Sequence, residues 1–485
     1  MVMTVTQGQA KALVIGMGAS GLASVEYLLE RGWCVRVADT RQAPPNRETF
    51  DRLGVEVSTG SLALSLLEGV SLVVMSPGIS PRFGVAAPLV EAARRQAIEV
   101  VGEIELFARE LARLKADKGY DPLVFGITGT NGKTTTTVLT SKMVQACGKT
   151  VITAGNIGPN AVHELLVAEK NNTLPEAWVL ELSSFQLETT FSLHCHAAAF
   201  LNLTEDHLDW HGSMHAYGEA KARIFTPGTV RIANRADEAT LRWSAPTPMN
   251  PGQQVTFGID EPSQLGDIGL REEAGVVTVV KRSASGLVDV IREDEIRLLG
   301  RHNTTNAMAA LLMIEATGLS VLPAIEVLKT YGGEKHRVEE VLRTDDDVIV
   351  VDDSKGTNVG AVLAAVEGFR LQKRRVMIVL GGDGKGQDFH PLAPVLAEAA
   401  GRVALIGRDA PKIYEALSTT TLDMERFGTL EEAVTWLWQG RQPGDVILLS
   451  PACASWDMFK DYAERSAKFI AWAQHLANEE KQSVL

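Results

Sequence analysis

Gly126-Ile-Thr-Gly-Thr-Asn-Gly-Lys-Thr-Thr-Thr136 is the stretch that decides the fold. The apolar segment Leu123–Phe125 before it predicts a buried strand, and residues 134–145 after it predict a helix. A strand, a glycine-rich turn and a helix N-terminus together bind phosphate, because backbone N–H groups and the helix dipole favour an anion there. In such a loop Lys133 reaches the β- and γ-phosphates of a nucleotide, and the Thr134 hydroxyl ligates Mg²⁺.

The spacing of this loop differs from the strict nucleotide-binding pattern G-x-x-x-x-G-K-[ST]. Ile127 stands where that pattern has its first glycine, and Gly126 and Gly129 flank it. The alternative interpretation is a glycine-rich turn that opens an ordinary helix. Because the strand, the Gly-Lys-Thr run and the helix all agree, the sequence favours a phosphate-binding loop.

Length and composition indicate a globular enzyme with several domains. The chain has 485 residues, enough for about three domains with cores of their own. Its hydrophobic content of 45% and charged content of 22% are typical of soluble enzymes. A net charge of −13 argues against a general binder of nucleic acids or anionic membranes. No apolar run is long enough for a transmembrane helix, so we expect no membrane partner.

The cysteines give no indication of disulfides or of a zinc site. They form no C-x-x-C pair and fit reduced thiols; they are Cys34, Cys147, Cys195 and Cys453. The N-terminus has neither a basic start nor an apolar run, unlike a secretion signal. We expect a cytoplasmic protein that is a monomer.

The first third of the chain predicts a strand–helix–strand unit. Ala12–Ile15 is a strand, Gly16-Met-Gly-Ala-Ser-Gly21 is a turn, and residues 22–30 form a helix. Cys34–Ala38 is a second strand, and it ends at Asp39. A G-x-G-x-x-G turn with an acidic residue after the second strand is typical of NAD sites. By itself it indicates only that a diphosphate can approach a helix N-terminus, or that the domain has this fold without a ligand.

Strands and helices continue to alternate towards the middle of the chain. Leu72–Met75 predicts a strand that ends at the turn Ser76-Pro-Gly78. A helix over 89–96 leads into a strand at Val100-Val101. The charged stretch 109–121 predicts the end of a helix and a linker.

Two strand ends in the middle third carry candidate metal ligands. Strands are predicted at 151–153, 178–180 and 197–201, and the second ends at Glu181. A carboxylate there can hold Mg²⁺ beside the phosphate loop, and the alternative is a surface glutamate. After the third strand, His207 and His211 lie four residues apart. No His-Glu-x-x-His and no third ligand accompany them, so they are taken as ordinary polar residues rather than as zinc ligands.

Two other polar features remain open on spacing alone. Lys221 lies on a helix predicted over 217–225, where a lone lysine is normally a solvated charge. Residues 226–295 are strand-like and rich in turns, with no visible chemistry. Asn303 and Asn306 near the start of the next helix can face a base or ribose together, or cap that helix.

The last third predicts another α/β domain after a linker at Tyr331-Gly-Gly333. Its strands are expected at 348–351, 376–380, 403–406 and 446–449. Polar loops with Lys355, Lys385 and Ser455 follow three of them, and a helix is expected from Trp456. Ligands of open parallel sheets bind at such carboxyl ends of strands.

These motifs resemble those of the Mur ligases, ATP-dependent enzymes that form amide bonds in peptidoglycan precursor synthesis. The loop Gly129–Thr135 is similar to theirs, which accounts for its unusual spacing. The resemblance covers nearly the whole chain, and its further motifs are Glu181–Gln186, Asn202–His207, His302–Asn306 and His336-Arg337. It implies an α/β fold with three domains: a Rossmann-like domain over 1–115 that binds a UDP-sugar, a central P-loop ATPase-like domain over 116–332, and a Rossmann-like domain over 333–485 that binds the amino acid and part of ATP.

Three features resemble the members of this family that add D-glutamate. They are Asp353–Asn358, Gly381–Lys385 and Ser450–Ser455. The Asp-Asn-Pro-Arg motif of the diaminopimelate-adding members is absent. The departures from the usual residues concern substrate fit and lie at Ser20, Gly356, Trp456 and Tyr462.

The resemblance assigns the nucleotide sites. The first glycine turn holds uridine diphosphate rather than NAD. The residues implied for the UDP-substrate are Gly18, Ala19, Ser20, Asp39, Thr40, Arg41, Ser76, Gly78, Asn156 and Gln186. Those implied for ATP are Gly129, Thr130, Asn131, Gly132, Lys133, Thr134, Thr135, Asn303, Asn306, Arg337 and Asp353.

The resemblance also reverses the interpretation of Lys221 and His207. In this family the matching lysine carries a CO₂ adduct, a carbamate, whose oxygen can ligate Mg²⁺ where an ammonium would repel it. The implied ligands of two Mg²⁺ ions are Thr134, Glu181, His207 and carbamylated Lys221.

The implied reaction is phosphoryl transfer followed by acyl transfer. The carboxylate of UDP-MurNAc-L-alanine attacks the ATP γ-phosphate, and the D-glutamate amine attacks the acyl phosphate. The implied catalytic residues are Lys133, Lys221, His207, Lys355 and Arg337, and those for D-glutamate are Thr357, Lys385, Ser455 and Tyr462. The alternatives are a sister ligase, such as one that adds L-alanine to UDP-MurNAc, an NAD-dependent oxidoreductase, and a P-loop nucleotide switch.

Overall fold

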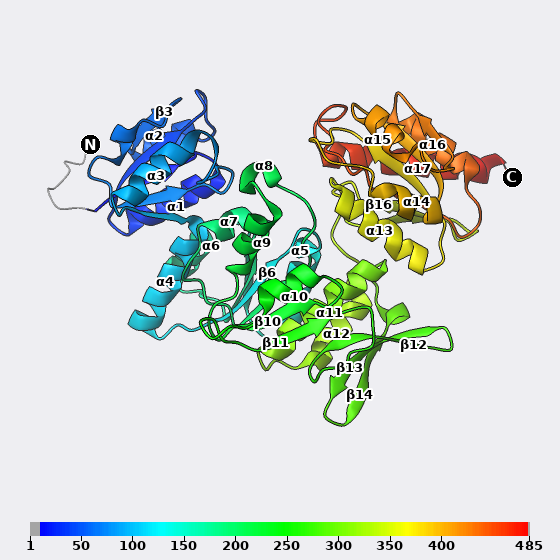
Figure 1. Cartoon of the computed structure of the whole chain (residues 1–485), viewed down its shortest axis with the longest axis horizontal. Helices are drawn as coiled ribbons and strands as arrows, with labels where there is room; N and C mark the ends of the chain where they lie inside the picture. Colours follow the sequence, from blue (N-terminus) through cyan, green and yellow to red (C-terminus); the bar gives the residue numbers. More distant parts are fainter. Residues whose placement is uncertain (1–9, 484–485) are drawn as a thin grey trace. The chain divides into compact units, whose positions relative to one another are not determined.

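The computed structural model describes residues 10–483 (Figure 1). These residues form two compact units, each described here by itself. The first comprises residues 10–271, 280–290 and 308–327, and the second comprises 272–279, 291–307 and 328–483. Within the first unit we distinguish an N-terminal region, residues 10–102, and a middle region, residues 123–271.

The N-terminal region is a five-stranded parallel sheet in the order β3-β2-β1-β4-β5. Its strands are β1 (Lys11–Ile15), β2 (Cys34–Asp39), β3 (Glu56–Thr59), β4 (Leu72–Met75) and β5 (Glu99–Gly102). Its helices are α1 (Ala19–Glu30), α2 (Arg47–Leu53), α3 (Ala87–Arg95) and the short turns η1 (Leu64–Leu67) and η2 (Gly84–Ala86). All the strands predicted here are confirmed. The order of strands reverses between β1 and β4, where ligands of such sheets bind.

The prediction of a helix end and a linker over 109–121 is right about the helix end and wrong about the extent of the linker, which begins only at Gly119. The stretch 109–121 mostly continues α4 (Glu103–Lys118), because Phe107 and Leu114 bury an apolar face despite the surrounding charges. The helix ends at Gly119, whose φ of 68° is the left-handed conformation that commonly closes helices.

The middle region is built on a parallel sheet with strands in the order β11-β10-β9-β6-β8-β7. These strands are β6 (Leu123–Thr128), β7 (Val151–Gly155), β8 (Ala177–Glu181), β9 (Ala197–Phe200), β10 (Val230–Asn234) and β11 (Gln254–Phe257). Along the chain follow β12 (Ile268–Glu273), β13 (Val276–Ser283), β14 (Gly286–Arg292) and the turn η3 (Glu293–Glu295). The loop that decides the fold leaves β6 in the interior of this sheet.

The helices of this part of the chain include the three that the sequence predicts, at 134–145, at 217–225 and around Asn306, together with five that it does not predict. They are α5 (Lys133–Ala146), α6 (Ala161–Asn171), α7 (Ser184–Glu188), α8 (Leu208–His211), α9 (Met214–Ala222), α10 (Glu238–Ser244), α11 (Arg301–Ala316) and α12 (Val321–Thr330). The stretch 226–295 is strand-rich as predicted but also contains α10. Asp237 begins α10 by accepting hydrogen bonds from the N–H groups of Ala239 and Thr240.

The second unit holds a doubly wound sheet in the order β15-β16-β20-β17-β18-β19, in which only β15 is antiparallel. Its strands are β15 (Glu339–Arg343), β16 (Ile349–Asp352), β17 (Val376–Gly381), β18 (Ala400–Ile406), β19 (Met424–Arg426) and β20 (Val446–Leu449). Its helices are α13 (Val359–Leu371), α14 (Leu392–Ala399), α15 (Ala410–Leu417), α16 (Leu430–Gly440) and α17 (Tyr462–Ser483). The first three of these helices pack on one face, and α16 and α17 pack on the other.

The helix expected from Trp456 begins six residues later. The N–H groups of Met458 and Phe459 donate to the Ser455 carbonyl and form a turn. Asp461 then accepts a hydrogen bond of 2.9 Å from the N–H of Glu464, which places the helix start at Tyr462.

The first glycine turn gives a test of close packing. A Cβ on Gly21 would lie 1.9 Å from the Gly16 carbonyl oxygen, whereas a Cβ on Gly18 would meet nothing within 4 Å. Gly21→Ala should therefore lower the free energy for opening β1 by about 2 kcal/mol, the scale of an overpacked core. Gly18→Ala should change it by less than ~0.5 kcal/mol. Hydrogen exchange of the β1 amides measures both, and equal losses would contradict this account.

Candidate active site

The loop after β6 is held in shape by glycine and by one asparagine. Gly132 begins α5 with a φ of 82°, which side-chain-bearing residues rarely adopt. The Asn202 amide clamps the loop from the end of β9, because it accepts from the Asn131 N–H at 2.8 Å and donates to the Asn131 carbonyl at 3.0 Å. The loop thus has a fixed backbone, as phosphate binding requires.

Two lysines converge on one carbonyl of this loop. Lys133 Nζ donates to the carbonyls of Gly129 at 2.9 Å and Thr130 at 2.7 Å, and Lys221 Nζ donates to Gly129 at 2.7 Å. The expectation that Lys221 is a solvated charge is wrong, since the residue is only 1% exposed. Burial first, and then repulsion by Lys133, lower the pKa of Lys221 well below its usual value. The site therefore favours a neutral amine at Lys221.

Tyr217 completes the surroundings of Lys221, and sequence reasoning missed it. Its ring lies under the amine, with Nζ 4.6 Å from the ring centroid, and its hydroxyl lies 3.2 Å from Thr130 Oγ1. Tyr217 and Lys221 are four residues apart on α9, so they share one helix face. That spacing was the signal available in the sequence.

Glu181 at the end of β8 has the environment of a cation ligand. It is 2% exposed, so the alternative of a surface glutamate is wrong. Its Oε1 accepts from Asn156 Nδ2 at 2.8 Å, while its buried Oε2 has no hydrogen-bond partner in the described part of the chain. An unpaired buried carboxylate oxygen is costly unless a cation meets it. The hard oxygens of Glu181 and of the nearly buried Thr134 fit Mg²⁺.

The two histidines after β9 have different environments. His207 has a φ of 55° at the start of α8, and its ring centroid lies 4.7 Å from that of Phe185. His211 is buried, and its Nε2 lies 2.9 Å from Ser184 Oγ. Neither belongs to a group of three potential metal ligands within residues 10–483; such a group occurs at His336, Glu339 and Asp352.

His211 should make stability depend on pH. Burial is the largest cause that lowers the pKa of His211 to about 3 from 6.5. As pH falls below 6.5 the unfolded imidazole binds a proton that the folded one does not, so the free energy of unfolding falls. This one group contributes at most about 1.4 kcal/mol per pH unit. Urea denaturation between about pH 5 and pH 7 should show a shallower slope for His211→Gln.

The matched control is His215→Gln, which removes an exposed histidine of α9. It should leave the slope unchanged. Equal slopes for wild type and His211→Gln would show that His211 is not responsible.

The carboxyl ends of β1, β2 and β4 bring together most residues predicted for the UDP-substrate. Asp39 accepts from the Met17 N–H at 2.7 Å and pairs with Arg41, which lowers the pKa of Asp39 to about 2. Ser76 Oγ lies 3.4 Å from the Gly16 carbonyl. Nearby positions along the same strand ends are Gly18, Ala19, Thr40 and Gly78. The turn thus faces an ionised, ordered carboxylate.

Three more of these residues belong to contacts of the middle region. Asn160 Nδ2 donates to Ser20 Oγ at 3.1 Å, which ties the first helix to the start of α6. The side-chain oxygen Oε1 of Gln186 accepts from the Ser183 N–H at 3.0 Å and so caps α7. Asn156 holds Glu181, as described above.

In the second unit, Asn303 and Asn306 pair with each other. Asn306 Nδ2 donates to Asn303 Oδ1 at 3.1 Å, and Asn303 Nδ2 donates to the Leu299 carbonyl at 2.8 Å. Because α11 begins at Arg301, both asparagines lie inside the helix, and the capping alternative is wrong.

The loop after β16 is organised by Arg465, a buried residue that sequence reasoning missed. Its guanidinium donates to Ser354 Oγ at 3.0 Å, to the Ser354 carbonyl at 2.7 Å and to the Cys453 carbonyl at 3.1 Å. Asp353 in the same loop accepts from Ser450 Oγ at 2.6 Å, and burial raises the pKa of Asp353 to about 7. Lys355 Nζ lies 4.9 Å from the centroid of the Tyr462 ring.

The other loops of this unit are joined to each other. Gln387 Nε2 donates to the carbonyls of Gly384 at 3.0 Å and Thr357 at 3.5 Å. Asp383 pairs with Ala454 through backbone hydrogen bonds, which places the loop of Lys385 beside that of Ser455. The residues predicted to bind the amino acid thus come from connected loops.

Three family descriptions match successive parts of the chain. They are the Mur ligase MurD-like N-terminal domain over residues 10–102, the Mur ligase middle domain over 127–314 and the Mur ligase glutamate ligase domain over 336–453. The chain belongs to the Mur ligase family. The family predicted from the motifs is confirmed.

Relatives that match over nearly their whole length support the same family. The chain is 47% identical to the UDP-N-acetylmuramoylalanine--D-glutamate ligase of Ralstonia nicotianae, over 94% of this chain and 95% of that protein. It is 45% identical to the enzyme of the same name from Paraburkholderia phymatum, over 96% of each chain.

Solved Mur ligases share the fold. MurF from Thermotoga maritima in complex with ADP superposes with a TM-score of 0.59 at 15% identity, over 97% of this chain and 96% of that one. UDP-N-acetylmuramate-alanine ligase from the same organism superposes with a TM-score of 0.53 at 18% sequence identity, over 96% of this chain and 99% of that one. The three-domain α/β fold is therefore confirmed. No helix within residues 10–483 has the length and apolar character needed to cross a membrane.

Proposed function

We propose that this Mur ligase joins D-glutamate to UDP-MurNAc-L-alanine with ATP, a step in making peptidoglycan precursors. The observation that carries the proposal is the near-full-length identity to ligases of that name. The phosphate loop with its two lysines, beside a buried carboxylate, supports the ligation chemistry. The protein acts as a cytoplasmic monomer.

Each predicted domain has its own substrate in this proposal. Residues 1–115 bind the UDP-sugar, residues 116–332 bind ATP, and residues 333–485 bind the amino acid and part of ATP. The UDP diphosphate lies at the turn of Gly18, Ala19 and Ser20, and the uridine lies near Asp39. Asn156 and Gln186 contact the sugar side from the middle region.

ATP binds with its phosphates on the loop Gly129–Thr135. Lys133 leaves the carbonyls it contacts and reaches the γ-phosphate, where its charge offsets the negative charge that develops during transfer. The substrate carboxylate attacks the γ-phosphorus, the bond to ADP breaks, and an acyl phosphate forms. Asn303 and Asn306 support the nucleotide, and Arg337 and Asp353 lie near its phosphates.

Thr134, Glu181 and His207 hold Mg²⁺ together with a carbamate on Lys221. When bound, the metal neutralises charge on the phosphoryl oxygens. The low pKa of the buried Lys221 supports carbamylation, because only a neutral amine attacks CO₂. A C–N bond forms, the nitrogen loses a proton, and an anionic oxygen becomes available as a ligand.

D-glutamate binds at the loops of the second unit. Thr357 and Lys385 hold its α-carboxylate, and Ser455 and Tyr462 hold its side-chain end. Its amine attacks the carbonyl carbon of the acyl phosphate, phosphate leaves, and the amine loses a proton as the amide forms. Lys355 stabilises the charge near the departing phosphate.

The choice of amino acid is tested by phosphate release. With ATP, Mg²⁺ and UDP-MurNAc-L-alanine, phosphate should appear with D-glutamate and stay at background with L-glutamate or diaminopimelate. A sister ligase would instead release phosphate with UDP-MurNAc and L-alanine. That result would overturn the D-glutamate assignment and leave the ligase chemistry standing.

The carbamate is tested by chemical rescue. Lys221→Ala should lower turnover at least about 100-fold, the scale of losing one group that stabilises a transition state. Added acetate or formate should restore part of the rate, because a small carboxylate can enter the vacated space and supply the oxygen. Methylamine should restore none. Rescue by the amine and not by the acids would show that Lys221 acts as a cation.

A further inference from the structure

A loop of the N-terminal region, residues 80–83, packs against the segment of the middle region that carries His207. Ser80 Oγ donates to the Trp210 carbonyl at 3.2 Å. The Phe83 ring lies so close to Gly212 that a Cβ there would be 2.8 Å from it. Between these contacts, Arg82 Nε donates to Glu188 Oε1 at 2.7 Å. Three adjacent contacts thus join the two regions.

Glu188 is the last residue of α7, a helix of five residues whose Phe185 contacts the ring of the proposed ligand His207. The helix follows directly on the strand that ends at Glu181. The ring of its Phe185 lies 4.7 Å from that of His207 and 4.6 Å from that of Trp210. The position of α7 therefore determines where the His207 ring can lie.

The negative charge of the buried Glu188 carboxylate is balanced mainly by Arg82. Its side chain is 3% exposed, and its second oxygen has Arg223 only at 3.9 Å. Removing one partner of a buried ion pair is strongly destabilising, because the remaining charge is left in a poor solvent. Without Arg82 the end of α7 would move towards water, and Phe185 would move with it.

We propose that Arg82 is a positioning residue for the metal site: it fixes α7, and through Phe185 it fixes His207. This inference rests on the proposed function, since it takes His207 as a metal ligand. Groups that orient metal ligands from the second layer typically contribute about 10- to 100-fold to metal affinity. Arg82 itself contacts neither the metal nor the nucleotide in this proposal.

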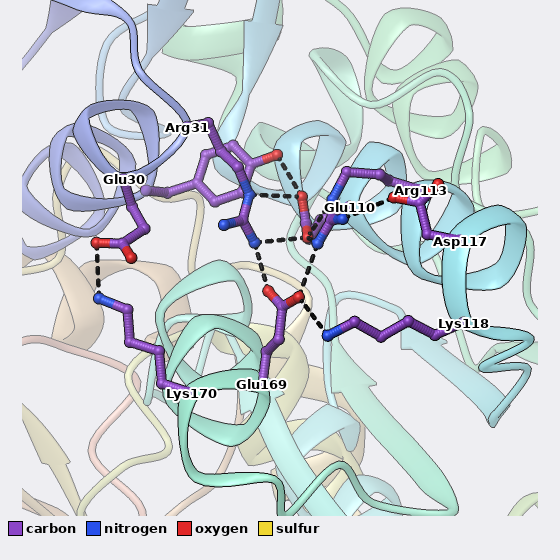
Figure 2. Close-up of polar contacts among 9 residues, drawn as sticks. Glu30, Arg31, Glu110, Arg113, Asp117, Lys118, Glu169 and Lys170 are labelled. Carbon is purple, nitrogen blue, oxygen red and sulfur yellow. Dashed lines mark hydrogen bonds and ion pairs between the residues drawn. The ribbon is translucent and has the colours of Figure 1, made fainter.

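The same chain offers a matched control in Arg31, which also joins the N-terminal and middle regions (Figure 2). Arg31 lies between Glu110 and Glu169, and its Nη2 donates to Glu110 Oε1 at 2.7 Å. Glu110 is as buried as Glu188 and also accepts from the Tyr27 hydroxyl at 2.8 Å. The hydrogen bonds of this cluster involve α1, α4 and α6 and none of the elements around His207.

The experiment measures binding of Mn²⁺, as a probe for Mg²⁺, by electron paramagnetic resonance with a non-hydrolysable ATP analogue. Arg82→Ala should weaken Mn²⁺ binding about 10-fold, and Arg82→Lys should fall between it and the wild type. Arg31→Ala should lower the thermal midpoint yet change the Mn²⁺ affinity by less than about twofold.

If Arg82→Ala does not fold, Ser80→Ala tests the same loop with a smaller expected loss of stability. Ser80 Oγ also accepts from the N–H groups of Arg82 at 3.3 Å and Phe83 at 3.2 Å, so its loss loosens the loop without exposing a buried charge. It should weaken Mn²⁺ binding as well. Unchanged affinity in the Arg82 and Ser80 variants, or an equal loss in Arg31→Ala, would overturn the inference. Failure of the wild type to bind Mn²⁺ would contradict the metal site itself, and with it both proposals.

Discussion

The carbonyl of Gly129 is the point on which the active site depends, because it accepts hydrogen bonds from two lysines. Lys133 comes from the helix that the loop begins, and Lys221 comes from α9, 92 residues along the chain. Two ammonium groups that share one buried carbonyl repel each other, and burial disfavours their charged forms. The conflict falls on Lys221, which lies over Tyr217 and whose pKa is lowered well below its usual value, first by burial and then by repulsion from Lys133.

The opposite problem arises at Glu181, where one carboxylate oxygen is buried without a hydrogen-bond donor among residues 10–483. Lys221 does not supply that donor in the structure, because its Nζ is directed to the Gly129 carbonyl. A site that tolerates such a cost usually recovers it on binding a ligand, here a divalent cation.

Much of this fold could be predicted because its strands are short apolar runs that end in glycine or polar residues. β1, β4 and β20 were located to within one residue at each end by that pattern. Local capping caused the errors, because Asp461 and Asp237 begin helices through hydrogen bonds that apolar periodicity does not report. The linker within 109–121 is shorter than predicted because charges on one face of α4 concealed an apolar face that continues the helix to Lys118.

The residues of the candidate active site also differ in how far the sequence alone could predict them. Residues of the glycine-rich loop were evident from local spacing, whereas Lys221 was recognised only by resemblance, since its burial depends on elements distant in sequence. Arg465, Tyr217 and Arg82 are ordinary residues in the sequence, and their roles come from tertiary contacts.

Helix α7 carries residues beside two of the proposed sites in the first unit. Gln186, proposed for the sugar nucleotide, and Phe185, which supports His207, are neighbours on one short helix. The capping hydrogen bonds of Gln186 with Ser183 and the ion pair of Glu188 with Arg82 fix the two ends of that helix. A helix of five residues has little stability of its own, so its position is set by these end contacts. If Gln186 contacts the substrate and His207 binds the metal as proposed, both sites depend on a single position of α7.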